Sequence, residues 1–156
     1  MIIINKGLDI IEKNSTLYHP YGNLGNAYIF NSTIKVNKSE YFAEEIRMSK
    51  LSNYIEYLKD KNLALIKLDI EGSEGKAIQS GIDLIVKYHI PFIFMEFQPS
   101  RLNSKGTEPK SFLQLFEDNG YKISIKDFLS EQFSSMEQLL KEKEINIYII
   151  YTKFLE

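Results

Sequence analysis

The feature that most constrains the fold is the run Leu63-Ala-Leu-Ile-Lys-Leu-Asp-Ile70, which is nearly all apolar and has the length of a strand. This pattern is typical of a central strand that is covered on both faces. Glu71-Gly72-Ser73 interrupts the run, and Ser73 is a suitable N-cap for a helix from Glu74 to about Tyr88. A second apolar run, Pro91 to Phe97, follows. This order predicts a βαβ unit with parallel strands.

Further elements are predicted on both sides of this unit. We expect a short buried strand from Met1 to Ile4, then an irregular loop over residues 14–33 with short strands at Tyr28–Phe30 and Ile34–Val36. Apolar spacing and a capping-box serine predict helices over 51–59, 109–119 and 135–143 and strands over 121–125 and 145–151. Residues 1–156 are therefore expected to form one α/β domain, a three-layer sandwich with an antiparallel strand pair at the C-terminal edge.

Composition and charge narrow the function classes. The 19 basic and 21 acidic residues give a net charge of −2, so there is no excess of positive charge to bind a nucleic acid. The chain has no cysteine, which excludes a disulfide framework, a thiolate metal site and a thiol nucleophile. No apolar run approaches the roughly 20 residues that span a bilayer, and the apolar start at Met1 is too short for a signal peptide. We therefore expect a cytoplasmic protein without a membrane span or a nucleic-acid partner.

Three acidic residues are predicted at the ends of the two parallel strands. Asp69 and Glu71 follow the first strand, and Glu96 lies at the end of the second. Ligands of open parallel sheets bind beyond the carboxyl ends of the strands, so these three acids are the catalytic candidates. Gly72 permits a sharp turn into the helix, and free amides of residues 72–75 are expected to face the same crevice.

Substrate binding is assigned to His19, Gly72 and Ser73. His19 lies in a loop that is able to fold over the crevice, and Gly72 and Ser73 form the turn beside the acids. An alternative stays open for each acid, because a carboxylate at a strand end also caps the next helix or pairs with a lysine such as Lys67 or Lys76. No metal site is expected.

The segment Leu65-Ile-Lys-Leu-Asp-Ile-Glu-Gly-Ser-Glu74 resembles the most typical motif of the FkbM family of S-adenosylmethionine-dependent methyltransferases. In that family an apolar strand is followed by Lys, an apolar residue, Asp, an apolar residue, Glu-Gly, a small residue and Glu. Arg47 to Leu51 resembles the start of the short helix before the motif. Phe94-Met-Glu96 resembles the following strand, and Phe112 to Tyr121 the late helix that ends in Gly-Tyr. The resemblance covers residues 45–125 best.

This resemblance implies a Rossmann-like fold and transfer of a methyl group from S-adenosylmethionine to an oxygen of a sugar, lipid or small metabolite. It further implies that Asp69, Glu71 and Glu96 line the methyl-transfer crevice. A carboxylate there orients the acceptor hydroxyl and accepts its proton, directly or through a bound divalent ion. The implied partners are the cofactor and a small-molecule acceptor.

The sequence departs from the family in two places. Ser52 stands where the family has an aspartate after leucine, and the Gly-rich cofactor-binding strand and the acid that holds the ribose are missing. Met1 to Ile4 resembles the family's third strand, so we expect a fold truncated at the N-terminus, and no cofactor-binding residue is assigned. The strand Leu63–Ile70 would then have an open edge. The chain is then a fragment, a half completed by strands of another chain, or a decayed family member.

Two other functions stay open. A non-catalytic α/β module would bind a partner chain or a second copy of itself through the open edge, and would show no affinity for S-adenosylhomocysteine. A carboxylate hydrolase would use Glu71 and Glu96 as an acid/base pair, although a barrel needs more strands than this chain provides.

Overall fold

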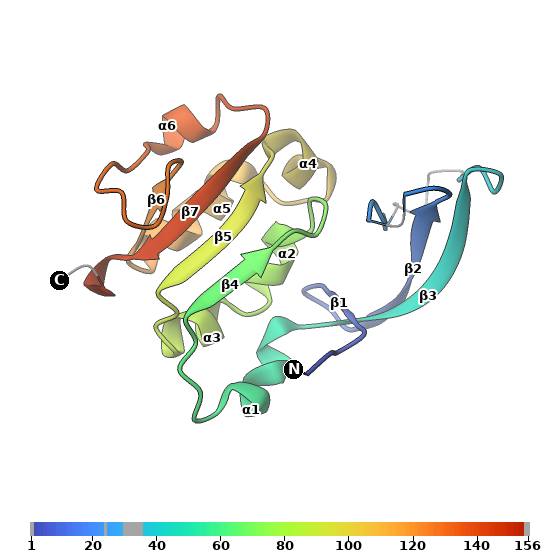
Figure 1. The fold of residues 1–156 in the computed structure, drawn as a ribbon, viewed down its shortest axis with the longest axis horizontal. Helices are drawn as coiled ribbons and strands as arrows, with labels where there is room; N and C mark the ends of the chain where they lie inside the picture. The colour runs from blue at the N-terminus through green and yellow to red at the C-terminus, as the bar shows by residue number, and fades with distance from the viewer. Residues whose placement is uncertain (1, 24, 30–35, 155–156) are drawn as a thin grey trace.

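The computed structural model describes residues 2–23, 25–29 and 36–154, which form two β-sheets and a set of short helices (Figure 1). The strands are β1 (Gly7–Leu8), β2 (Lys13–Pro20), β3 (Tyr41–Ser49), β4 (Leu65–Leu68), β5 (Phe92–Phe97), β6 (Tyr121–Ser124) and β7 (Ile145–Tyr151). The helices are η1 (Leu51–Tyr54), α1 (Ile55–Leu58), α2 (Glu74–Gln79), α3 (Ile82–Lys87), α4 (Pro99–Ser104), α5 (Pro109–Asp118), α6 (Met136–Leu139) and η2 (Thr152–Phe154).

The larger sheet is mixed and has the strand order β4-β5-β7-β6. β4 and β5 run parallel, with Leu65 opposite Phe92 and Leu68 opposite Met95, and α2 and α3 connect them. β7 runs antiparallel to both β5 and β6. The predicted βαβ unit and the antiparallel pair at the C-terminal edge are therefore confirmed, and the chain is an α/β protein.

The core lies between one face of this sheet and the helices α2, α3 and α5, which lie behind the sheet in Figure 1. Along β5, Ile93, Met95 and Phe97 are fully buried, whereas the residues between them are half-buried. This alternation is the pattern of a strand with one packed face. Phe112 and Phe116 of α5 complete the aromatic part of the core, with their ring centroids 5.2 Å apart.

The opposite face of the sheet is covered less completely. Phe128 packs on Phe92 and on Tyr148, with centroids 4.9 and 5.0 Å apart. At the edge strand β4, however, the Leu65 side chain is 52% exposed. Lys67, two residues further on the same face, is also exposed, so the prediction that this strand is covered on both faces is wrong for the described residues. β4 is also an edge strand of this sheet and not a central one.

The helix predicted from Glu74 to Tyr88 is two helices, α2 and α3, with a break at Ser80 and Gly81. The Ser80 hydroxyl donates to the carbonyl of Ala77 (2.7 Å) and accepts a hydrogen bond from the Leu51 amide (3.0 Å). A Cβ on Gly81 would overlap the Leu51 side chain. The break thus allows η1 to pack closely against the helix pair.

The smaller sheet has the order β1-β3-β2 and extends away from the larger one (Figure 1). β2 and β3 pair antiparallel from Lys13 opposite Met48 to Pro20 opposite Tyr41, and β1 pairs parallel with the last residues of β3. Most of β3 is exposed or half-buried, and only Met48 and Ser49 at its end are buried. This sheet is therefore joined to the core mainly at its base.

Two predictions for the N-terminal region are wrong. Residues 2–4 form no strand, and Ile3 is 78% exposed, because the strand that joins β3 begins later, at Gly7. Residues 13–20, expected largely within an irregular loop, form a regular strand that is stabilised by its ladder with β3. Tyr28 makes a single bridge to Tyr18. The remaining residues of the two short predicted strands lie mostly outside the described part of the chain.

The C-terminal elements agree with the sequence. α5 begins at Pro109, and Gly120 follows it with a φ of 81°, as expected for its C-terminal end. Ser135 accepts a hydrogen bond from the Gln138 amide at the start of α6, although that helix already ends at Leu139. No helix in the described ranges is long and apolar enough to cross a membrane.

Candidate functional site

The turn after β4 is fixed by its own backbone and by a buried acid. Glu71 and Gly72 have φ values of 57° and 90°, so the chain reverses through the left-handed region, where glycine is favoured. The Ser73 amide donates to the carbonyl of Ile70 (3.2 Å) and closes the turn. Glu74, only 3% exposed, accepts a hydrogen bond from the Ile70 amide (3.0 Å). The orientation of Glu71 therefore follows from a rigid turn.

This turn differs from the expected one in two respects. Ser73 precedes α2 as its N-cap residue, but its side chain makes no capping hydrogen bond. Its amide is also used within the turn and is not free to face the crevice. The orientation of the strand end comes instead from the Glu74 carboxylate, the last residue of the motif.

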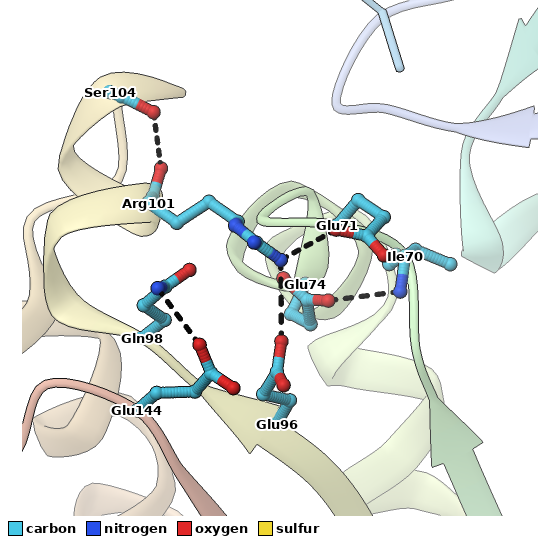
Figure 2. Close-up of polar contacts among 8 residues, drawn as sticks. All are labelled: Ile70, Glu71, Glu74, Glu96, Gln98, Arg101, Ser104 and Glu144. Carbon is cyan, nitrogen blue, oxygen red and sulfur yellow. Dashed lines mark hydrogen bonds and ion pairs between the residues drawn. The ribbon is translucent and has the colours of Figure 1, made fainter. Parts of the chain in front are cut away.

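Arg101 brings two of the predicted acids together. Its Nη1 lies 2.5 Å from Oε2 of Glu71 and 3.3 Å from Oε2 of Glu96 (Figure 2). Glu71 follows β4, Glu96 lies on β5, and Arg101 comes from α4, which begins directly after β5. The guanidinium therefore joins two neighbouring strand ends and compensates both carboxylates.

Glu96 lies close to the negative charges of other glutamates. Burial raises the pKa of Glu96, the neighbouring charges of Glu144 and Glu71 raise it further, and only Arg101 opposes them. Glu144 itself accepts a hydrogen bond from Nε2 of Gln98 (3.1 Å), which lies beside the same cluster in Figure 2. Glu96 is thus the acid in this cluster that binds a proton more readily than an ordinary glutamate.

Asp69, the third predicted acid, does not join the Arg101 cluster. Its carboxylate lies 3.3 Å from Nζ of Lys67, and its side chain is 63% exposed. Pairing with Lys67 is one of the alternatives that the sequence leaves open, and it occurs here at the surface.

A cavity of about 320 Å³ lies between this turn and the smaller sheet. Asp69, Glu71 and Ser73 line one wall. The opposite wall is mainly apolar and comes from the smaller sheet and the segment after β2, with Leu8, Leu17, Ala27, Ile29, Ile46 and Met48. The acids therefore border a hollow whose other wall is largely apolar, as in many small-molecule sites.

The remaining predicted site residues lie elsewhere. His19 is on β2, stacked on Phe42 with ring centroids 4.6 Å apart, and its Nε2 lies 3.3 Å from a Glu44 carboxylate oxygen. It is not among the residues that line the cavity. Gly72 packs against Arg101, and a Cβ there would overlap the arginine side chain. Of the three positions assigned to substrate binding, Ser73 alone lines the cavity.

Sequence reasoning did not assign roles to Arg101 and Lys105. Lys105 also lines the cavity, and its Nζ donates to the carbonyl of Ile29 (2.5 Å). The available signal is electrostatic: two acids predicted at neighbouring strand ends require a cation, and Arg101 is the first basic residue after Glu96. Within the described residues, no group of three or more His, Asp or Glu side chains is arranged to bind a metal ion.

A family model described as the methyltransferase FkbM domain matches residues 7–123, from β1 into β6. The matched region contains the turn after β4, the Arg101 cluster and the cavity walls named above. No curated protein and no solved structure matches the chain. Because the family model covers well over half of the sequence, the chain belongs to the FkbM methyltransferase family.

Proposed function

We propose that this chain binds the acceptor in an S-adenosylmethionine-dependent O-methyl transfer, with a hydroxyl of a sugar, lipid or small metabolite as the methyl acceptor. The observation that carries the proposal is the placement of Asp69 and Glu71 on one wall of an otherwise largely apolar cavity at the end of β4. Apolar walls bind the body of a small molecule, and a few polar groups fix its orientation.

The acids suit the demands of this chemistry. An acceptor hydroxyl must be oriented and must give up its proton, and a carboxylate within hydrogen-bond reach is able to do both. Arg101 holds the Glu71 carboxylate in place from the side of α4. Asp69 is more exposed and bound only by a surface lysine among the contacts described, so it is the less constrained proton acceptor. Positioning of the hydroxyl is expected to supply most of the rate enhancement.

The residues described here do not form a complete site for the cofactor, which supplies the methyl group in this family. Within the described residues, no strand lies beside the free edge of β4. We therefore assign the described residues to the acceptor, and methyl transfer requires that the cofactor site is completed elsewhere in the chain or across an oligomer. We further propose that strands beside β4 and helices over its open face complete a three-layer, Rossmann-like domain. The proposed location of the protein is the cytoplasm.

The first experiment is calorimetric titration of the purified chain with S-adenosylhomocysteine. Micromolar binding supports the proposal, because it means that the cofactor site is completed within this chain or across an oligomer. A folded chain that shows no binding contradicts methyl transfer by this chain alone. Circular dichroism of the same sample provides the check on folding.

Substitution of the acids tests the site once transfer to a hydroxyl acceptor is measured with labelled S-adenosylmethionine. Asp69→Asn and Glu71→Gln are each expected to lower the rate at least tenfold, since a neutral amide cannot accept the proton. Glu56→Gln, an exposed acid on α1, is the matched control and is expected to leave the rate unchanged. Normal turnover in both site variants would reduce the two acids to structural residues.

A non-catalytic partner-binding module is the second candidate, favoured by the free edge of β4 and the exposed Leu65 on it. Such an edge is a template for pairing with another strand. This candidate predicts a stable homo-oligomer or a bound partner chain together with no affinity for S-adenosylhomocysteine. The hydrolase alternative is weaker, because Arg101 occupies the space between Glu71 and Glu96.

A further inference from the structure

A second hollow, of about 350 Å³, adjoins the cavity at the candidate site. Five residues line both hollows: Leu8, Ile29, Met48, Ser73 and Lys105. The two hollows are therefore adjacent, and the acids Asp69 and Glu71 line the first of them only. The second hollow is lined mainly by basic and polar residues, and its charge determines which groups it is able to bind.

Three lysines, Lys13, Lys76 and Lys105, line the second hollow against a single carboxylate, that of Asp9. Asp9 is 5% exposed, and one of its oxygens lies 2.8 Å from Nζ of Lys13 and 3.9 Å from Nζ of Lys76. Its other oxygen accepts a hydrogen bond from the Ile10 amide (2.7 Å). One buried carboxylate thus pairs with two of the three lysines, so the lining of this hollow carries an excess of positive charge.

The positive charge of Lys105 is partly buried and lies close to other cations. Its Nζ contacts the carbonyl of Ile29, which is a neutral acceptor. Burial lowers the pKa of Lys105, and the neighbouring charges of Lys76 and Arg101 lower it further, against the opposing charges of Glu71 and Glu74. The cations at this end therefore repel one another, and an added negative charge would relieve that repulsion.

We propose that the basic hollow binds an oxyanion group, a phosphate or a carboxylate, carried by the same acceptor whose hydroxyl lies at Asp69 and Glu71. This inference rests on the proposed function for its hydroxyl end. Asp69 and Glu71 line only the first hollow and repel the anionic group, whereas Lys13 and Lys76 line only the second and attract it, so a bound molecule has one orientation. The apolar side chains of Leu8 and Met48 between the two ends suit a carbon skeleton. Asn14, Ser15 and Ser73 supply further hydrogen-bonding groups at the basic end.

The test uses inorganic phosphate as the probe and the full chain, followed by amide chemical shifts in two-dimensional NMR at constant ionic strength. Saturable shifts are expected at Ser15, Ser73 and Lys76, with no comparable effect of chloride. Lys13→Gln and Lys76→Gln are each expected to weaken phosphate binding about tenfold, as the loss of a charge-assisted hydrogen bond predicts. Lys61→Gln, an exposed lysine before β4, is the matched control and keeps the affinity of the unmodified chain.

Two results overturn the inference. Shifts that do not saturate, or that respond equally to Lys61→Gln, mean that phosphate only screens surface charge. Competition by S-adenosylhomocysteine that depends on Lys13 and Lys76 assigns the lysines to the carboxylate of the cofactor instead of the acceptor.

Methyl transfer and phosphate binding are measured separately, so the proposed function and the anion site are tested independently. Asp69→Asn is expected to abolish most methyl transfer without weakening phosphate binding, because it removes a carboxylate and leaves Lys13 and Lys76 in place. Phosphate binding through the lysines in a chain that transfers no methyl group would preserve the anion site and reject the hydroxyl end.

Discussion

The two sheets of this protein contribute differently to the cavity between them. The larger sheet is packed on α2, α3 and α5, and side chains such as Ile93 and Phe116 are fully buried. The smaller sheet has buried residues only at its base, near Met48, and its hairpin is otherwise exposed or half-buried. The wall that carries the acids is therefore rigid, whereas the wall that carries Leu17 and Ile46 is stabilised mostly by its own ladder.

This difference in packing suits different roles for the two walls. Groups that take part in chemistry need a fixed geometry, which the Glu71 turn obtains from Glu74 and Arg101. Groups that select the acceptor need only present a suitable surface, and less stable elements often do this. Substitutions in the two walls are expected to change the free energy of unfolding by different amounts, because the two walls are packed differently.

The largest expected effect concerns the cores of the two sheets. Ile93→Ala, at a fully buried position of β5, is expected to lower the free energy of unfolding by about 3 kcal/mol, because it removes apolar contacts and leaves a cavity. Leu17→Ala on β2 is expected to cost about 1 kcal/mol or less, since Leu17 is half-buried and faces the cavity. Urea unfolding followed by circular dichroism measures both. Equal losses would show that the smaller sheet is as well packed as the larger.

A smaller effect is expected at two glycines with nearly the same backbone conformation. Gly22, in the turn after β2, has a φ of 89°, and Gly72, in the site, has a φ of 90°. A Cβ on Gly22 meets nothing within 4 Å, whereas one on Gly72 overlaps Arg101. Gly22→Ala is therefore expected to cost about 1 kcal/mol from backbone strain alone, and Gly72→Ala about 1 kcal/mol more.

A double-mutant cycle tests whether the extra loss of stability in Gly72→Ala comes from the overlap with Arg101. Truncation of the arginine in the double variant Gly72→Ala/Arg101→Ala removes the overlapping side chain, so the two losses are expected to be less than additive. Chemical denaturation of the four chains in this cycle measures the coupling. Strict additivity would mean that Arg101 does not pack against Gly72 in solution.

The difference in packing between the two sheets also explains which elements the sequence predicts and which it does not. β4, β5, α5 and β7 follow from their apolar patterns, because burial on a packed face imposes a period. The β2 strand has the sequence Lys-Asn-Ser-Thr-Leu-Tyr-His-Pro, whose turn-forming residues conceal a strand that depends on its ladder with β3. The break at Gly81 depends on the approach of Leu51, which is a tertiary contact.

The site shows the same limit. The two apolar runs place Glu71 and Glu96 at neighbouring strand ends, and the structure brings these acids together through Arg101. The separation of Asp69 from this pair arises from its exposed position beside Lys67. Periodicity and spacing locate residues along elements, whereas the choice of ion-pair partner depends on distances between elements that a single sequence does not contain.

The smallest expected effect is a dependence of stability on pH that has opposite signs at two glutamates. Burial and the charges of Glu144 and Glu71 raise the pKa of Glu96, whereas hydrogen bonds from Ser111 and Lys110 at the start of α5 lower the pKa of Glu108. A raised folded-state pKa means that stability is full below the usual value of 4.5 and is lost as the pH rises through the folded pKa. A lowered pKa means the reverse: stability is present above that value and is lost as the pH falls through the folded pKa.

Glu96→Gln is therefore expected to raise the Tm at pH 7 by about 1 °C and to have no effect near pH 3, because the wild-type side chain is then also neutral. Glu108→Gln is expected to lower the Tm at pH 7, since the amide caps α5 less well than the carboxylate, and this loss too disappears at low pH. Differential scanning calorimetry across this pH range measures both variants. A lower Tm for Glu96→Gln at pH 7 would show that the ion pair with Arg101 outweighs burial and the repulsion from Glu144 and Glu71, and that the acids of the site are stabilised as charges.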